Sequence, residues 1–215
     1  MNRRAMKERV KEIFGGYLLE EGNSMGYAYT ETVRALGRQI FSEIMPLTLG
    51  DEERKLAEMA FNVQLFFVWV GNKFPYDGIV LGKSYAEKLM KICEDCSVLM
   101  EFLAEHQDKI ITDSIRSGLT KERCLQIKEN VQKLSGGLEI AIEGLEPGHG
   151  VGVAPQTVRN LYNVGGIFLK ALFGDEQSDS FQKEFNAYIK ILNEVSNSCE
   201  QSFISSGDTN NLKPN

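Results

Sequence analysis

The segment Ser84–Gln107 reads SYAEKLMKICEDCSVLMEFLAEHQ and repeats apolar residues at alternating spacings of four and three positions. The repeating positions are Tyr85, Leu89, Ile92, Cys96, Leu99 and Leu103. Such spacings average about 3.5 residues and place the whole series on one stripe of an α-helix. The segment therefore predicts a long helix whose apolar stripe packs against another helix.

Two further segments repeat the same spacing. Their positions are Ile127, Val131, Leu134, Leu138, Ala141 and Leu145 in one segment, and Phe181, Phe185, Tyr188, Leu192, Val195 and Cys199 in the other. The first of them follows the 84–107 helix after a connection of roughly a dozen residues, which favours an antiparallel arrangement of neighbouring helices. We therefore expect a long antiparallel pair over 84–107 and 120–145.

The remaining periodicity and the helix-boundary residues predict further helices and no strand. The expected helices cover about 3–20, 27–45, 51–72, 84–107, 120–145 and 155–173, and a last one begins near Asp179 and Gln182, which have capping-box spacing. The fold class that follows is all-α, a single-domain bundle of about seven helices over residues 1–205. The polar residues 206–215 predict a flexible C-terminal tail.

Composition and charge narrow the classes of partner. The chain has 215 residues, 42% of them hydrophobic, and a formal net charge of −6, so we expect no binding to nucleic acid. The longest apolar run, Leu65–Val70, is far shorter than the roughly 20 residues of a membrane-spanning helix, so no transmembrane segment is expected. Charged residues interrupt the N-terminal segment where a secretion signal would be apolar, which favours a cytoplasmic location.

The N-terminal helix is locally basic although the chain is acidic. Its cations are Arg3, Arg4, Lys7, Arg9 and Lys11, accompanied by two glutamates. A solvated helix face is the favoured interpretation, and a contact with phosphate or lipid is the alternative.

Cys93 and Cys96 have the Cys-x-x-Cys spacing of redox motifs. Thioredoxin-type chemistry needs that pair at a helix N-terminus after a strand, whereas here it falls in the middle of a predicted helix. Buried structural thiols are therefore the favoured interpretation, and a regulatory redox pair is the alternative. Zinc would need further ligands from Cys124, Cys199 or a histidine, so no metal site is predicted.

The glycine-rich segment Glu146–Pro155, EPGHGVGVAP, is the best candidate for a small-molecule contact. Its glycines leave backbone amides accessible, and the helix expected from Pro155 would present its positive end to an anion. The predicted ligand-binding residues are Gly148, His149, Gly150, Gly152 and Arg159. A plain connection between two helices is the favoured alternative.

Adjacent glycines occur inside predicted helices at 15–16, 136–137 and 165–166. Each glycine costs about 1 kcal/mol relative to alanine in a helix interior, so the pairs suggest a compensating gain. Close helix crossing or a kink is the favoured explanation. A planar ligand lying against bare backbone is the alternative.

The segment Leu134-Ser-Gly-Gly137 resembles the glycine-rich distal helix of haem oxygenases, which are all-α chains of similar length. The resemblance covers four residues and implies a tetrapyrrole-like cofactor in a helical site. That family ligates iron with a histidine in its first helix, whereas the histidines of this chain are His106 and His149. No cofactor is therefore expected, and a tetrapyrrole-like ligand is the alternative.

Few residues suit catalysis. The segment Gly78–Ser84, GIVLGKS, is one residue short of a phosphate-binding loop, and the Glu-x-x-His pairs of di-iron bundles are absent from the sequence. A serine or cysteine triad needs a histidine base, and His106 is expected at a solvated helix end. The sequence therefore does not favour an enzyme.

The leading functional hypothesis is a cytoplasmic interaction protein, a regulatory, adaptor or chaperone-like module. The heptad seams and the apolar 61–70 segment offer more hydrophobic surface than a small bundle needs, which favours binding to another protein and self-association as a homo-oligomer. The alternative is a helical ligand-binding protein or enzyme that holds an anionic or planar cofactor.

Overall fold

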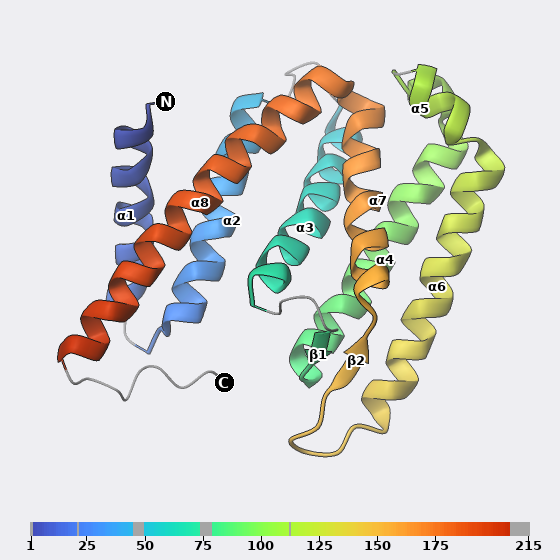
Figure 1. The fold of residues 1–215 in the computed structure, drawn as a ribbon. Helices are drawn as coiled ribbons and strands as arrows, with labels where there is room; N and C mark the ends of the chain where they lie inside the picture. The colour runs from blue at the N-terminus through green and yellow to red at the C-terminus, as the bar shows by residue number, and fades with distance from the viewer. Residues whose placement is uncertain (1, 21, 45–49, 74–78, 112, 207–215) are drawn as a thin grey trace. The chain divides into compact units, whose positions relative to one another are not determined.

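A computed structural model of the chain describes residues 2–20, 22–44, 50–73, 79–111 and 113–206. Seven long α-helices account for most of these residues, so the prediction of an all-α helical bundle is confirmed (Figure 1). They are α1 (Arg3–Leu19), α2 (Met25–Ile44), α3 (Asp51–Lys73), α4 (Lys83–Glu105), α6 (Lys121–Glu143), α7 (Pro155–Phe173) and α8 (Asp175–Ser206). The predicted tail lies outside the described residues except for Ser206, the last residue of α8.

Short elements were missed by the sequence analysis. They are the strands β1 (Ile79–Leu81) and β2 (Val151–Val153), the 3-10 turn η1 (Gln107–Lys109) and the helix α5 (Asp113–Gly118). The prediction of no strand was therefore wrong. A strand of three residues is too short to reveal an alternating pattern, which explains the error.

The start predicted for the last helix was also wrong. Gly174 ends α7 with φ +80°, and α8 begins at the next residue, Asp175. A single glycine in the left-handed region makes this corner because it has no Cβ to clash there. Asp179 and Gln182 consequently lie inside α8, so their spacing does not mark a helix start.

The helices group into two compact units, each described separately below. One unit comprises Met1–Met45 and Asp179–Asn215, and the other comprises Pro46–Ser178. The proposal of one continuous domain over 1–205 stays a prediction. None of the helices in the described part of the chain combines the length and the apolar composition needed to cross a membrane.

In the unit Pro46–Ser178, α4 and α6 lie side by side and run in opposite directions (Figure 1). Lys128 of α6 forms an ion pair with Glu101 of α4. At the other end of the pair, β1 and β2 form an antiparallel sheet in which Val80 faces Gly152. The sheet thus joins the residues that precede α4 to those that follow α6.

Helices α3 and α7 of the same unit cross at the glycine pair 165–166. A Cβ on Gly165 would lie 2.6 Å from the backbone oxygen of Ala60, closer than real Cβ contacts come. Close crossing therefore explains this pair. It does not explain Gly136 or Gly137, where a Cβ would meet nothing within 4 Å.

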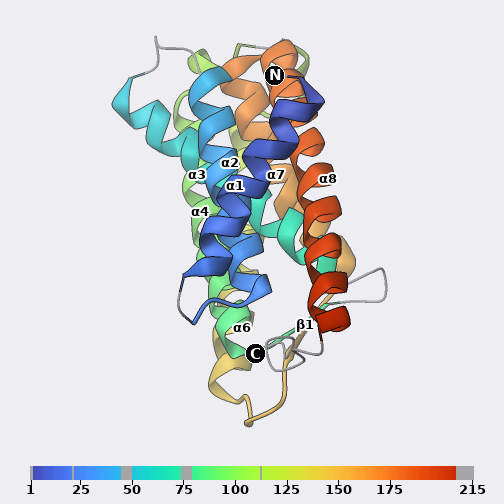
Figure 2. The ribbon, with the colours of Figure 1, turned by 90° about the vertical axis from the view of Figure 1, so that its left-hand side faces the viewer.

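In the other unit, α1 and α2 form a helical hairpin, and the part of α8 from Asp179 runs in the same direction as α1 (Figure 1, Figure 2). The Tyr29 hydroxyl donates to Asn193 Oδ1 at 2.6 Å, linking α2 to α8. The rings of Phe41 and Phe181 meet edge to face with centroids 6.4 Å apart. Polar and aromatic contacts thus fix both ends of the α2–α8 packing.

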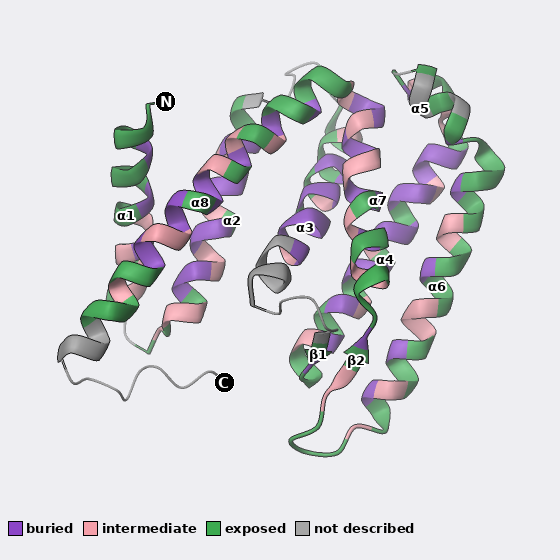
Figure 3. Cartoon of the chain, in the orientation of Figure 1, coloured by how far each residue is buried: buried purple, intermediate pink, exposed green. Residues whose placement is uncertain are grey.

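The apolar stripes on α4 and α8 are used inside the chain (Figure 3). On α4 the buried members are Leu89, Ile92, Cys96, Leu99 and Leu103, and on α8 they are Phe181, Phe185, Tyr188, Leu192 and Val195. The stripe on α6 is less covered, with Val131 and Leu138 buried and the others half-buried. These seams are therefore mostly part of the core.

Glycine-to-alanine substitutions should separate the two kinds of glycine pair. Gly165→Ala should lower the free energy of unfolding by about 1–3 kcal/mol because its methyl group overlaps the α3 backbone. Gly136→Ala, the matched control, should raise it by about 0.5–1 kcal/mol through helix propensity alone. Chemical denaturation measures both. Equal stabilisation by the two changes would contradict the close crossing.

A charge in the α8 seam should unfold the protein. The Leu192 side chain is fully buried, so Leu192→Lys should lower the free energy of unfolding by at least about 3 kcal/mol. Asn197→Lys, at an exposed position of the same helix, should change it by less than about 0.5 kcal/mol. The measurement is circular dichroism during urea denaturation. If the Leu192→Lys variant stayed folded but changed from an oligomer to a monomer, this seam would instead lie between chains.

Candidate functional site

Helix α1 presents two neighbouring stripes, and only one of them is closed by packing. Met6, Val10 and Phe14 are buried. The adjacent stripe holds Lys7, Lys11, Gly15 and Leu18 at helical spacing. The two lysines lie at one end of this stripe, and Gly15, which has no side chain, lies between them and Leu18. A helix with this sequence buries one edge and leaves the next edge incompletely covered.

A cleft of about 430 Å³ lies between that second stripe and α8. The lining residues are Lys7, Lys11, Phe14, Gly15, Leu18, Val195, Ser198 and Cys199. Carbon atoms provide most of the lining, and the lysines add positive charge. Cavities that hold small molecules typically measure roughly 300–1,000 Å³, so this cleft has a comparable volume, although it is open to solvent along one side.

Gly15 is the residue that keeps the cleft open. A Cβ built on Gly15 would meet nothing within 4 Å, and the same holds for its neighbour Gly16. Close helix crossing, the favoured explanation from sequence, therefore does not account for this pair. The absent side chain at Gly15 instead leaves space between α1 and α8.

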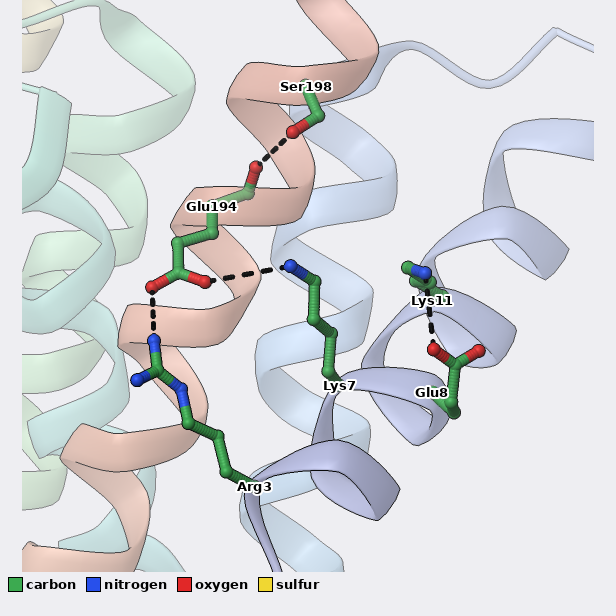
Figure 4. A network of polar contacts seen from close by, with 6 residues as sticks. All are labelled: Arg3, Lys7, Glu8, Lys11, Glu194 and Ser198. Carbon is green, nitrogen blue, oxygen red and sulfur yellow. Dashed lines mark hydrogen bonds and ion pairs between the residues drawn. The ribbon is translucent and has the colours of Figure 1, made fainter.

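Ion pairs link α1 to α8 beside the cleft (Figure 4). Arg3 donates to Glu194 Oε1 at 3.1 Å, and the Lys7 ammonium lies 3.9 Å from Glu194 Oε2. The Arg3 side chain is 75% exposed and the Glu194 side chain 36% exposed. Exposed pairs contribute about 0.2–1 kcal/mol, less than the roughly 1.5–3 kcal/mol from burying an aromatic ring such as that of Phe14, so apolar packing holds α1 in place.

Lys11 turns toward its own helix. Its ammonium donates to Glu8 Oε1 at 3.2 Å, and both side chains are at least half exposed (Figure 4). On α8, the Ser198 hydroxyl donates to the backbone oxygen of Glu194 at 2.8 Å. The cations beside the cleft are thus held only by weak surface pairs.

Cys199 is the thiol of this cleft. It is half-buried, whereas the other three cysteines of the chain are buried. Burial, with a smaller effect from Glu200, raises the pKa of the Cys199 thiol above its usual value. Cys199 is therefore a partly accessible thiol that its surroundings do not activate.

The predicted anion loop adopts a turn followed by a strand. Gly148 has φ +83°, and the His149 amide donates to the Glu146 backbone oxygen at 3.1 Å. The His149 imidazole is 70% exposed and lies 3.9 Å from the Glu146 carboxylate, beyond hydrogen-bond distance. This turn is solvent-exposed.

Strand β2 separates the turn from α7. It places three extended residues, about 10 Å of chain, between the turn and the helix that carries the exposed Arg159. A Cβ on Gly150 would lie 2.5 Å from Val80 Cγ1, so this glycine lets β2 approach β1. Gly152 pairs with Val80 in the sheet. Ligand binding by Gly148, His149, Gly150, Gly152 and Arg159 stays a prediction.

The structure places Cys93 and Cys96 in the interior of α4, both fully buried. Burial raises the pKa of the Cys93 thiol to about 12 and raises the pKa of the Cys96 thiol as well. Thiols with raised pKa values carry little thiolate near neutral pH, which supports the structural interpretation over a redox role.

Other chemical groups are dispersed. Among the described residues, no group of three or more His, Cys, Asp and Glu side chains is arranged to hold a metal ion. His106 stacks on Phe102, with ring centroids 4.3 Å apart, and its Nδ1 lies 3.1 Å from the Phe102 backbone oxygen. In the segment Gly78–Ser84, which resembles a phosphate-binding loop, Gly78 lies outside the described residues. Lys83 is the first residue of α4 and so belongs to a helix.

Comparison of the chain with known protein families, with curated proteins and with solved structures finds no match. The site therefore has to be judged from its own geometry. Sequence analysis noted both components of the cleft on α1, the basic cluster and the glycine pair 15–16, without connecting them. Lys7, Lys11 and Gly15 share one stripe of the helix, and this spacing could have connected them. The residues of α8 that face this stripe lie about 180 positions away in the chain, so the sequence did not reveal the cleft.

Thiol alkylation should distinguish the cysteines. In the folded protein at about pH 8, iodoacetamide should modify Cys199 at least about tenfold faster than Cys93 or Cys96, because the latter are buried with raised pKa values. Peptide mass spectrometry gives the rate at each site, and urea-unfolded protein is the control in which all thiols should react. Fast modification of Cys93 or Cys96 in the folded chain would contradict this assignment.

Proposed function

We propose that this chain is a non-catalytic binding protein that holds a small, largely apolar molecule in the cleft between α1 and α8. The observation that carries the proposal is a cleft of about 430 Å³ whose middle is kept open by Gly15. An open glycine in a helix costs stability without any packing benefit in the empty protein. A ligand that fills the space supplies the missing contacts.

The chemical groups of the described residues support binding over catalysis. The Cys93 and Cys96 thiols are buried with raised pKa values, and His149 lies in an exposed turn. The cleft itself offers lysines, a serine hydroxyl bonded to its own helix, and the Cys199 thiol, whose pKa is raised by burial. None of these forms the nucleophile–base pair that covalent catalysis requires.

Binding to a partner protein and self-association remain predictions. The buried stripes of α4 and α8 are occupied by the chain's own core, so a partner would use other surfaces. A cleft of this volume suits a small molecule better than a protein segment, which usually buries about 800 Å² on each side. A tetrapyrrole-like ligand at Gly136 and Gly137, and a cytoplasmic location, likewise stay predictions.

A neutral fluorescent probe, Nile red, tests the proposed cleft. Gly15→Leu places a side chain in the open space and should weaken Nile red binding at least about tenfold by occupying the volume of the ligand. Gly16→Leu makes the same change at the adjacent glycine, which is not part of the lining, and should leave binding within about twofold of the unmodified protein.

Fluorescence titration measures the dissociation constant, and circular dichroism checks that both variants are folded. Protection of Cys199 from iodoacetamide by bound Nile red locates the probe independently of the substitutions. The proposed site would be overturned if Nile red bound saturably, if Gly15→Leu did not weaken this binding, and if bound Nile red did not protect Cys199.

A further inference from the structure

We infer that the ligand of this cleft is a single-chain amphipathic anion, with its charged group at Lys7 and Lys11 and its apolar chain along Gly15 and Leu18. This inference rests on the proposed function and adds the chemical class of the ligand. Lysine ammonium groups bind such an anionic group as hydrogen-bond donors.

The lining residues that α1 contributes are ordered from charged to apolar. On α1 the sequence of lining positions is Lys7, Lys11, Phe14, Gly15 and Leu18, so both cations come before the apolar residues. Eleven helical positions from Lys7 to Leu18 span about 16 Å, longer than a compact aromatic ring requires. An elongated chain with one charged end matches this gradient.

The surrounding charges favour an anion over a cation. Helix α1 contains five Lys and Arg residues and two Glu residues, although the whole chain carries a net charge of −6. Two of the carboxylates beside the cleft, Glu8 and Glu194, are already paired with Lys11 and Arg3, and a third, Glu200, lies near Cys199, away from the lysines in sequence. A cationic head group would have to displace one of those partners and would face the lysines.

Lys7 can bind an anion at little cost. Its ammonium lies 3.9 Å from Glu194 Oε2, too far for a hydrogen bond, whereas Arg3 donates to the same carboxylate at 3.1 Å. Arg3 therefore keeps Glu194 paired when Lys7 turns to a ligand. The 45% exposure of the Lys7 side chain leaves it room to move.

Three probes with the same alkyl chain and different head groups test the inference, all below their micelle concentrations. Dodecanoate should displace Nile red and protect Cys199 with at least about tenfold higher affinity than neutral dodecanol, and dodecyltrimethylammonium should bind more weakly than either. Equal affinity for dodecanoate and dodecanol would overturn the anion assignment and leave the proposed function standing. Failure of all three probes and of Nile red would overturn both.

Substitutions locate the head group. Lys7→Met combined with Lys11→Met should weaken dodecanoate binding about tenfold while changing dodecanol binding less than about twofold. Arg4→Met, the matched control, removes a cation from an exposed position of α1 outside the lining and should leave both affinities nearly unchanged. Glu194→Gln removes the carboxylate that competes for Lys7 and should strengthen dodecanoate binding about two- to fivefold.

Circular dichroism and Nile red binding show whether each variant keeps its fold and cleft. If the double lysine variant keeps its affinity for dodecanoate, the head-group assignment is wrong. If the unmodified protein binds vesicles containing phosphatidylglycerol but not monomeric dodecanoate, the basic face of α1 contacts an anionic membrane surface instead, and the inference is overturned.

Discussion

Burial of the heptad-spaced apolar stripes is the constraint on which the rest of the structure depends. The stripe of α4 and the stripe of α8 each supply five buried side chains within the chain. Each such side chain stabilises the fold by about 1.5–3 kcal/mol relative to exposure, far more than a surface ion pair. The core therefore uses the surface that a coiled-coil partner would need.

One incompletely covered stripe is on α1, and the glycine in it has a role opposite to that of a glycine in the other unit. At Gly165 the missing side chain lets α7 touch the α3 backbone, because a Cβ would lie 2.6 Å from Ala60 O. At Gly15 the missing side chain is not compensated by any neighbour within 4 Å of a Cβ. Adjacent glycines in a helix thus indicate tight packing in one case and open volume in the other.

Charge determines what the open volume selects, although it contributes little to stability. The exposed pairs of Arg3, Lys7 and Glu194 are individually weak in water, so they exchange partners readily. At the edge of the cleft, the same ammonium groups are able to exchange these weak partners for the anionic group of the proposed ligand. Weak ion pairs on α1 and selectivity for the proposed anion are therefore compatible.

The sequence by itself determined the helices, because periodicity is a local property that each segment carries alone. It predicted the seams of α4 and α8 and the start of α3 near residue 51. Only the tertiary structure decided the pairing of Val80 with Gly152, the different roles of Gly15 and Gly165, and the cleft facing Val195. These features depend on the distance between segments that are remote in the chain. The side chains of both segments set that distance together, so neither segment encodes it alone.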